Sequence, residues 1–106
     1  MRSSESIRRN LLRITPIGSS MEDVIRIAYE NDDWTIRRVS EDYGVFFWPN
    51  SSRPSSCIPG ENCTIVGDQS IQIYLGHTTF GVYVSAFYSF DENGVLIDIF
   101  IRRDWS

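Results

Sequence analysis

The chain has 106 residues, enough to bury one hydrophobic core, so we expect a single domain over residues 1–106. Hydrophobic residues make up 42% of the chain and aromatic residues 13%, which excludes an intrinsically disordered protein. The formal net charge of −4 argues against a nucleic-acid-binding protein, because such proteins usually carry a basic patch.

The sequence shows no signal for membrane insertion or secretion. No stretch approaches the roughly 18 apolar residues of a membrane-spanning helix. Residues 1–10 are polar and contain three arginines, so they lack the apolar centre of a secretory signal. We therefore expect a cytoplasmic protein without a membrane span.

Two helices are predicted in residues 1–33 and form a helical layer. Apolar residues recur at helical spacing in Ser3–Ile14, with Ser4 as the N-cap. A break containing Pro and Gly follows, and Ser19 or Ser20 then caps the second helix. The apolar stripe of the second helix consists of Met21, Val24, Ile25 and Ala28. A run of Asn and Asp ends it, because short polar side chains compete for backbone hydrogen bonds.

Residues 34–106 predict an antiparallel sheet, because short runs of aromatic and β-branched residues alternate with turn residues. The predicted strands are Trp34–Val39, Tyr43–Trp48, Thr64–Val66, Ser70–Gly76, Phe80–Phe90 and Val95–Ile101. The expected fold class is α+β, with two N-terminal helices packed on one face of a four- to five-stranded antiparallel sheet that ends in a long β-hairpin. A loop at 49–63, rich in Pro, Ser and Asn, interrupts the strands, and long loops are often functional.

The pair Asn93-Gly94 predicts the turn of the terminal hairpin, since both residues tolerate a positive φ. A two-residue turn there places Tyr88 opposite Ile99 and puts Ile97 on the apolar face of the sheet. A type I turn with Gly94 as a bulge shifts the pairing by one residue and mixes the two faces. The first register matches hydrophobic residues better, and we favour it.

The opposite face of the sheet carries a mixture of aromatic, hydroxyl and charged side chains. It consists of Gln72, Tyr74, Tyr83, Ser85, Phe87, Ser89, Asp98, Phe100 and Arg102. This composition is typical of a protein-binding surface. The candidate binding residues are Tyr74, Tyr83, Phe87, Phe100 and Arg102. The alternative is that this face is only the less buried side of the sheet, or that the long loop covers it.

Residues with catalytic or metal-binding chemistry are few and scattered. Cys57 and Cys63 either form a disulfide that closes a small ring or remain reduced thiols. His77 is the only histidine, so a zinc site lacks ligands and we expect no metal and no other cofactor. No acid/base pair or nucleophile with a matching base is apparent, and we expect no catalytic residues.

Residues 18–24 read Gly-Ser-Ser-Met-Glu-Asp-Val and resemble the Gly-x-Ser/Thr-x-Glu-x-Val helix opening of the BamE (SmpA/OmlA) family of outer-membrane lipoproteins. The resemblance implies two short helices packed on a small antiparallel sheet, a fold shared in outline by β-lactamase-inhibitor-protein domains. It also implies that Ser20 caps the helix and that Val24 faces the sheet. The chain departs from the family in Ile27–Asn31, which lacks the Gly and Pro of the family's turn, and it shows no lipoprotein leader.

These observations favour a small, non-enzymatic protein-binding module, resembling inhibitors or bacterial immunity proteins, whose partner is another protein. It would bind through the outer sheet face and the loop at 49–63. One alternative is a small enzyme or ligand-binding domain with a pocket around His77, Tyr74 and Trp48. Another is an envelope-associated scaffold of the BamE type.

Overall fold

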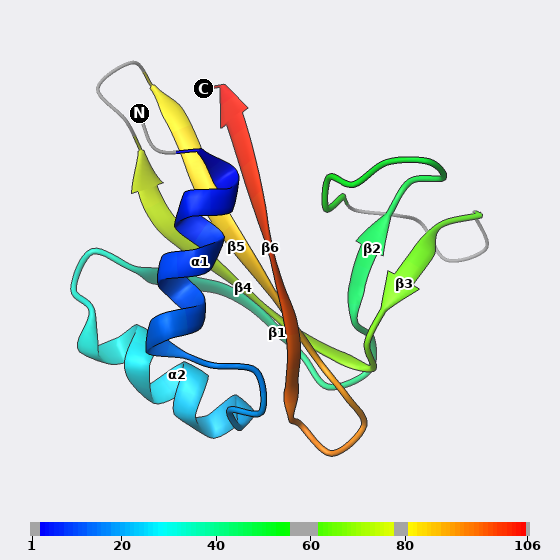
Figure 1. Ribbon diagram of the computed structural model, residues 1–106, viewed down its shortest axis with the longest axis horizontal. Coiled ribbons are helices and arrows are strands. Elements are labelled where there is room, and N and C mark those ends of the chain that lie inside the picture. The colour runs from blue at the N-terminus through cyan, green and yellow to red at the C-terminus, as the bar shows by residue number, and fades with distance from the viewer. Residues whose placement is uncertain (1–2, 56–61, 78–80, 106) are drawn as a thin grey trace.

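The structure is a computed structural model that describes residues 3–55, 62–77 and 81–105. Two helices pack on one face of an antiparallel sheet, which confirms the predicted α+β fold (Figure 1). The helices are α1 (Ser4–Ile14) and α2 (Met21–Glu30). The strands are β1 (Thr35–Ser40), β2 (Val45–Phe47), β3 (Thr64–Val66), β4 (Gln69–His77), β5 (Val82–Phe90) and β6 (Leu96–Trp105).

The strands form two separate sheets. The main sheet has four strands in the order β1-β4-β5-β6, and every neighbouring pair is antiparallel. Strands β2 and β3 pair only with each other and stand beside the main sheet (Figure 1). The chain thus leaves the main sheet after β1 and returns to it at β4. Strands β2 and β3 lie between these two points, and they pack on the face of the main sheet opposite the helices.

Both helices begin at serine caps, as the sequence predicts. The Ser20 hydroxyl accepts a hydrogen bond from the Asp23 backbone N–H, at 3.1 Å, at the start of α2. In α1 the cap is Ser3 rather than Ser4, because the Ser3 hydroxyl is the one that accepts from the Ser6 N–H. Asn31 ends α2, and its side-chain amide donates to the Ile27 carbonyl oxygen.

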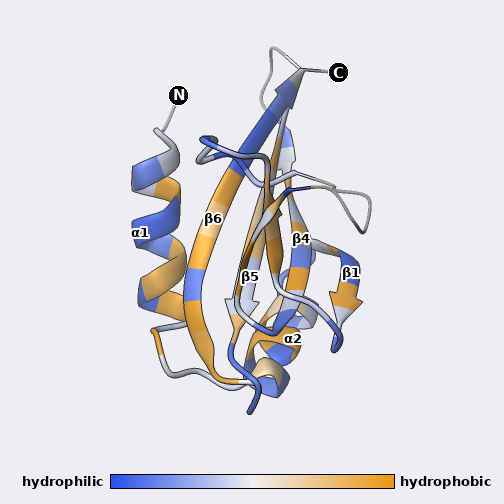
Figure 2. Ribbon diagram, turned by 90° about the vertical axis from the view of Figure 1, so that its right-hand side faces the viewer, coloured by the Kyte–Doolittle hydropathy of each residue, from blue (hydrophilic) through white to orange (hydrophobic). Residues whose placement is uncertain are grey.

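The core lies between the helices and the main sheet. Its buried residues are Leu11, Val24, Ala28, Ile71, Ile73, Ala86, Tyr88, Phe90, Leu96 and Ile99. The sheet residues among them alternate along β4 and β5, because successive side chains of a strand point to opposite faces. Figure 2 shows that β6 is apolar, apart from one hydrophilic segment, where it runs beside α1, and hydrophilic toward its C-terminal end.

An ion pair joins α1 to the edge of the sheet. The Arg8 guanidinium donates to the Asp98 carboxylate at 2.7 Å and to the Ile99 carbonyl oxygen at 3.1 Å. Both side chains are about one-third exposed, and the Asp98 carboxylate raises the pKa of Arg8. This contact fixes α1 along β6, so α1 covers the inner face of the sheet at its β6 edge.

The terminal hairpin combines the two registers that the sequence left open. The turn is the alternative one: the Gly94 N–H donates to the Asp91 carbonyl oxygen, and Gly94 has a φ of 75°. A bulge at Ile97 then shifts the pairing back by one residue, so Tyr88 lies opposite Ile99 as predicted. The placement of Ile97 on the apolar face is wrong, since the bulge leaves its side chain 40% exposed.

Two further sequence predictions concern membrane insertion and the state of the cysteines. Among the described residues, no helix is long and apolar enough to cross a membrane. Cys63 is disulfide-bonded, which is one of the two states that the sequence allowed. The second cysteine, Cys57, and the central part of the predicted loop lie outside the described residues.

Candidate binding surface

The outer face of the main sheet is divided into a covered half and an open half. In the covered half, β2, β3 and the residues after β2 pack on β5 and β6. The Phe47 ring meets the Phe100 ring edge-on, with 4.8 Å between the centroids, and Phe47 is buried. The Ser89 hydroxyl donates to the Val66 carbonyl oxygen at 2.6 Å. This half therefore serves to hold β2 and β3 in place.

Two of the five predicted binding residues belong to the covered half. Phe100 packs against Phe47, and the Arg102 guanidinium donates to the carbonyl oxygen of the buried Pro54 at 2.9 Å. Arg102 also pairs with Asp104 at 2.8 Å. These contacts give Phe100 and Arg102 a structural role, in line with the alternative that the loop covers part of this face.

The open half contains a cluster of aromatic side chains at the ends of β4 and β5. Tyr74 and Tyr83 lie with their ring centroids 5.8 Å apart, and the His77 ring is 5.7 Å from that of Tyr83. Tyr74 Oη and His77 Nδ1 share a hydrogen bond of 2.8 Å. Tyr83 is 42% exposed although its ring has these neighbours on two sides. The cluster is thus an exposed aromatic surface whose members hold one another in position.

Two consecutive arginines of β1 extend this cluster along the sheet. The Arg37 guanidinium carbon lies 5.1 Å from the centroid of the Tyr74 ring, and that of Arg38 lies 5.6 Å from the centroid of Tyr43. The Tyr43 carbonyl oxygen accepts from the Ser70 hydroxyl at 2.9 Å, which ties this residue to β4. We call the set Arg37, Arg38, Tyr43, Tyr74, His77 and Tyr83 the tyrosine-arginine surface.

Phe87 lies between the two halves. It is half-buried, and its register partners are Gln72 on β4 and Phe100 on β6. Of the five predicted binding residues, the structure therefore brings Tyr74 and Tyr83 together in the open half. It places Phe100 and Arg102 under the packed segment and Phe87 at the border.

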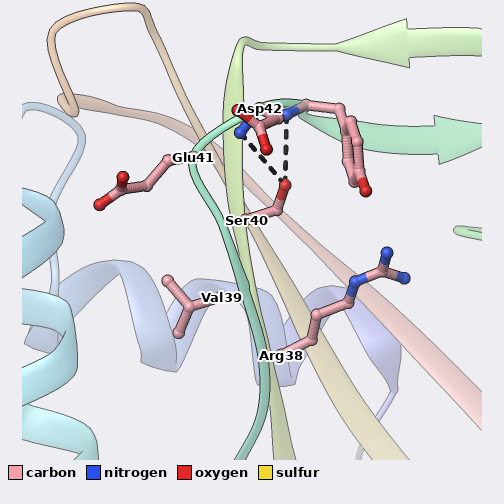
Figure 3. A pocket seen from close by; sticks show the side chains of 6 residues that line it. Arg38, Val39, Ser40, Glu41 and Asp42 are labelled. Atoms are coloured by element: carbon pink, nitrogen blue, oxygen red, sulfur yellow. Dashed lines mark hydrogen bonds between the residues drawn. The ribbon is translucent and has the colours of Figure 1, made fainter.

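Two hollows among the described residues lie away from His77, and the pocket predicted around His77, Tyr74 and Trp48 stays a prediction. The larger, of about 500 Å³, lies beside the turn after β1 and is lined only by consecutive residues, 38–43 (Figure 3). The smaller, of about 320 Å³, lies between α2 and β1. Within the described ranges, His77 contacts tyrosines, and no cluster of three His, Cys, Asp or Glu side chains gathers to bind a metal.

Sequence reasoning missed Arg37, Arg38 and Tyr43 as part of this surface. A regular strand would point the two arginines to opposite faces, and only the bulge between Ile36 and Arg38 changes that. The sequence does show an adjacent basic pair, Arg37-Arg38, with the aromatic Tyr43 shortly after it. This pattern does not reveal the bulge that places both arginines on one face.

Comparison of the chain with models of protein families, with curated proteins and with solved structures finds no match. The resemblance of residues 18–24 to the BamE family therefore stays a prediction. Its local expectations for Ser20 and Val24 agree with the structure, in which Ser20 caps α2 and Val24 is buried in the core.

Proposed function

We propose that this protein is a non-enzymatic protein-binding module that uses the tyrosine-arginine surface, together with the segment 49–63, to hold a partner protein. Its mode of action would resemble that of an inhibitor or an immunity protein, with the partner's active region as the target. The observation that carries the proposal is the exposed ring of Tyr83, packed beside Tyr74 and His77. Tyrosines held in this way are typical interface anchors, because they bury a large area and lose little conformational entropy.

The open half also differs from an ordinary solvated sheet surface. Its aromatic rings contact one another and the arginines, so the side chains are ordered before a partner arrives. Such preorganisation lowers the entropy loss on binding. A scaffold of the BamE type stays an alternative within the class of binding proteins.

The compartment is a separate proposal. The disulfide bond of Cys63 is typical of an oxidising compartment. We therefore propose an oxidising compartment in place of the cytoplasmic location that the sequence predicts.

The test is a capture experiment from the lysate of the source organism with three tagged baits. These are the wild-type protein, Tyr83→Ala and the control Tyr29→Ala, whose tyrosine is 77% exposed on α2. We expect wild type and Tyr29→Ala to retain the same partner in equal amounts, and Tyr83→Ala to lose roughly tenfold or more of it. Urea denaturation of all three baits verifies that the fold is intact.

Two outcomes would overturn the proposal. One is capture of no protein above the tag alone. The other is equal capture by Tyr83→Ala and wild type, which would show that any partner binds elsewhere on the molecule.

A further inference from the structure

We infer that the tyrosine-arginine surface recognises an extended acidic segment of the partner protein, with carboxylates of that segment bound by Arg37 and Arg38. This inference rests on the proposed function and adds the chemistry of the ligand. Three observations support it: a bulge in β1 directs both arginines to one face, both contact tyrosine rings, and neither forms an ion pair among the described residues.

The bulge in β1 brings two consecutive cationic side chains onto one face. Ile36 pairs with Ile73 and packs against the core, and Arg38 pairs with Gln72 on the outer face. Arg37 is the additional residue between them, and its guanidinium lies over the ring of Tyr74, which is also on the outer face. Bulges commonly redirect a side chain in this way next to functional sites.

The contacts with tyrosine leave the N–H donors of Arg37 and Arg38 without a hydrogen-bond acceptor among the described residues. The guanidinium carbons of Arg37 and Arg38 lie 5.1 and 5.6 Å from the ring centroids of Tyr74 and Tyr43, and a cation–π contact of this kind is made without a hydrogen bond to an oxygen acceptor. A guanidinium with free N–H donors binds a carboxylate through two parallel N–H···O bonds. The tyrosines therefore position the arginines without satisfying their donors.

Neither arginine has an acidic partner among the described residues, although the chain is acidic overall. Arg8 and Arg26 each contact two carboxylates, whereas Arg37 and Arg38 form no ion pair in the described ranges. The nearest acidic residue along the chain after β1 is Glu41, and its side chain points to the opposite side from Arg38 (Figure 3). Two unpaired cations on one exposed face select for negative charge on a partner.

A short acidic peptide fits this surface better than a nucleic acid does. The net charge of −4 repels a long polyanion such as a nucleic acid. A short acidic segment carries few charges, so its attraction to the two arginines outweighs its long-range repulsion from the rest of the protein. The exposed ring of Tyr83 and the half-buried ring of Tyr74 beside the arginines provide an apolar contact for the rest of an extended segment.

The test selects binders to the wild-type protein from a displayed library of random peptides and measures the affinity of the enriched peptides. The test variant is Arg37→Gln with Arg38→Gln. The control is Arg9→Gln with Arg13→Gln, which removes the same charge from exposed arginines of α1 that form no ion pair among the described residues. We expect the enriched peptides to be rich in Asp and Glu. We also expect roughly tenfold weaker binding to the test variant, unchanged binding to the control, and weakening by salt.

The outcomes separate this inference from the proposed function. Enriched peptides without an excess of Asp and Glu that still require Tyr83 would overturn the acidic ligand and leave the binding module standing. A library that yields no binder, or binders indifferent to both Tyr83 and the arginines, would overturn both. A labelled single-stranded oligonucleotide that binds wild type and fails to bind the test variant would replace the peptide by a nucleic acid.

Discussion

The covered and open halves of the outer sheet face contain the same kinds of side chain but use them differently. In the covered half an aromatic ring, Phe100, and an arginine, Arg102, contact Phe47 and the carbonyl oxygen of Pro54. In the open half tyrosines and arginines contact one another, and Tyr43, Tyr83 and both arginines remain exposed. An outward-facing aromatic residue is therefore no indication of a binding site until it is known whether another segment covers it.

The largest expected difference between the halves comes from two glycines. Gly67 has a φ of 84°, and a methyl group on it would lie 2.7 Å from the Phe90 carbonyl oxygen. We expect Gly67→Ala to lower the free energy of unfolding by roughly 4 kcal/mol, because backbone strain and overpacking add. Gly76, in the open half, has a φ of 128° and no atom within 4 Å of the added carbon, so Gly76→Ala should lose about 1–2 kcal/mol. Urea denaturation measures both, and equal losses would contradict the close packing at Gly67.

A pair of aromatic substitutions gives the next largest difference. Phe47 is buried against Phe100, so Phe47→Ala should destabilise the protein by about 3 kcal/mol through lost burial and a residual cavity. Tyr83→Ala in the open half should change the free energy of unfolding by less than about 1 kcal/mol. The same urea titrations decide the point. A loss for Tyr83→Ala as large as that for Phe47→Ala would show that the open half is part of the core and would weaken the proposed function.

The smallest expected change in the free energy of unfolding at neutral pH concerns Tyr88, a tyrosine on the inner face of the sheet. Tyr88 is fully buried, and its hydroxyl forms no hydrogen bond within the described part of the chain. The Thr15 hydroxyl lies near that of Tyr88 but outside hydrogen-bonding geometry, and it donates its own proton to the Leu11 carbonyl oxygen. Tyr88→Phe removes a buried polar group without a partner and should stabilise the protein by up to about 1 kcal/mol.

The same substitution should change the response to alkaline pH. Burial raises the pKa of Tyr88 to about 12, from an ordinary value of 10.0. The folded state therefore holds this proton more tightly than the unfolded state, and stability is lost as the pH rises from about 10 to about 12. Urea denaturation at these pH values should show a smaller loss for Tyr88→Phe than for wild type, whereas Tyr83→Phe should follow wild type. Equal alkaline slopes for all three proteins would refute the assignment to Tyr88.

The site shows which parts of a binding surface sequence reasoning can reach. Tyr74 and Tyr83 were predicted to share a face because residues of one face alternate along paired strands, and the structure places their rings 5.8 Å apart. The same alternation put Phe100 and Arg102 on that face correctly, yet it could not show that the segment after β2 packs over them. Arg37 was missed because alternation fails at a bulge.

The sequence by itself determined the elements that depend on neighbouring residues. Ser20 caps α2, the apolar stripe of α2 faces the core, and Asn and Gly make the hairpin turn, since each of these effects acts within a few residues. The tertiary structure alone decided the bulges at Arg37 and Ile97 and the packing of β2 and β3 on the outer face. Those features depend on contacts between segments far apart in the chain, such as Ser89 with Val66, and local propensity carries no information about such contacts.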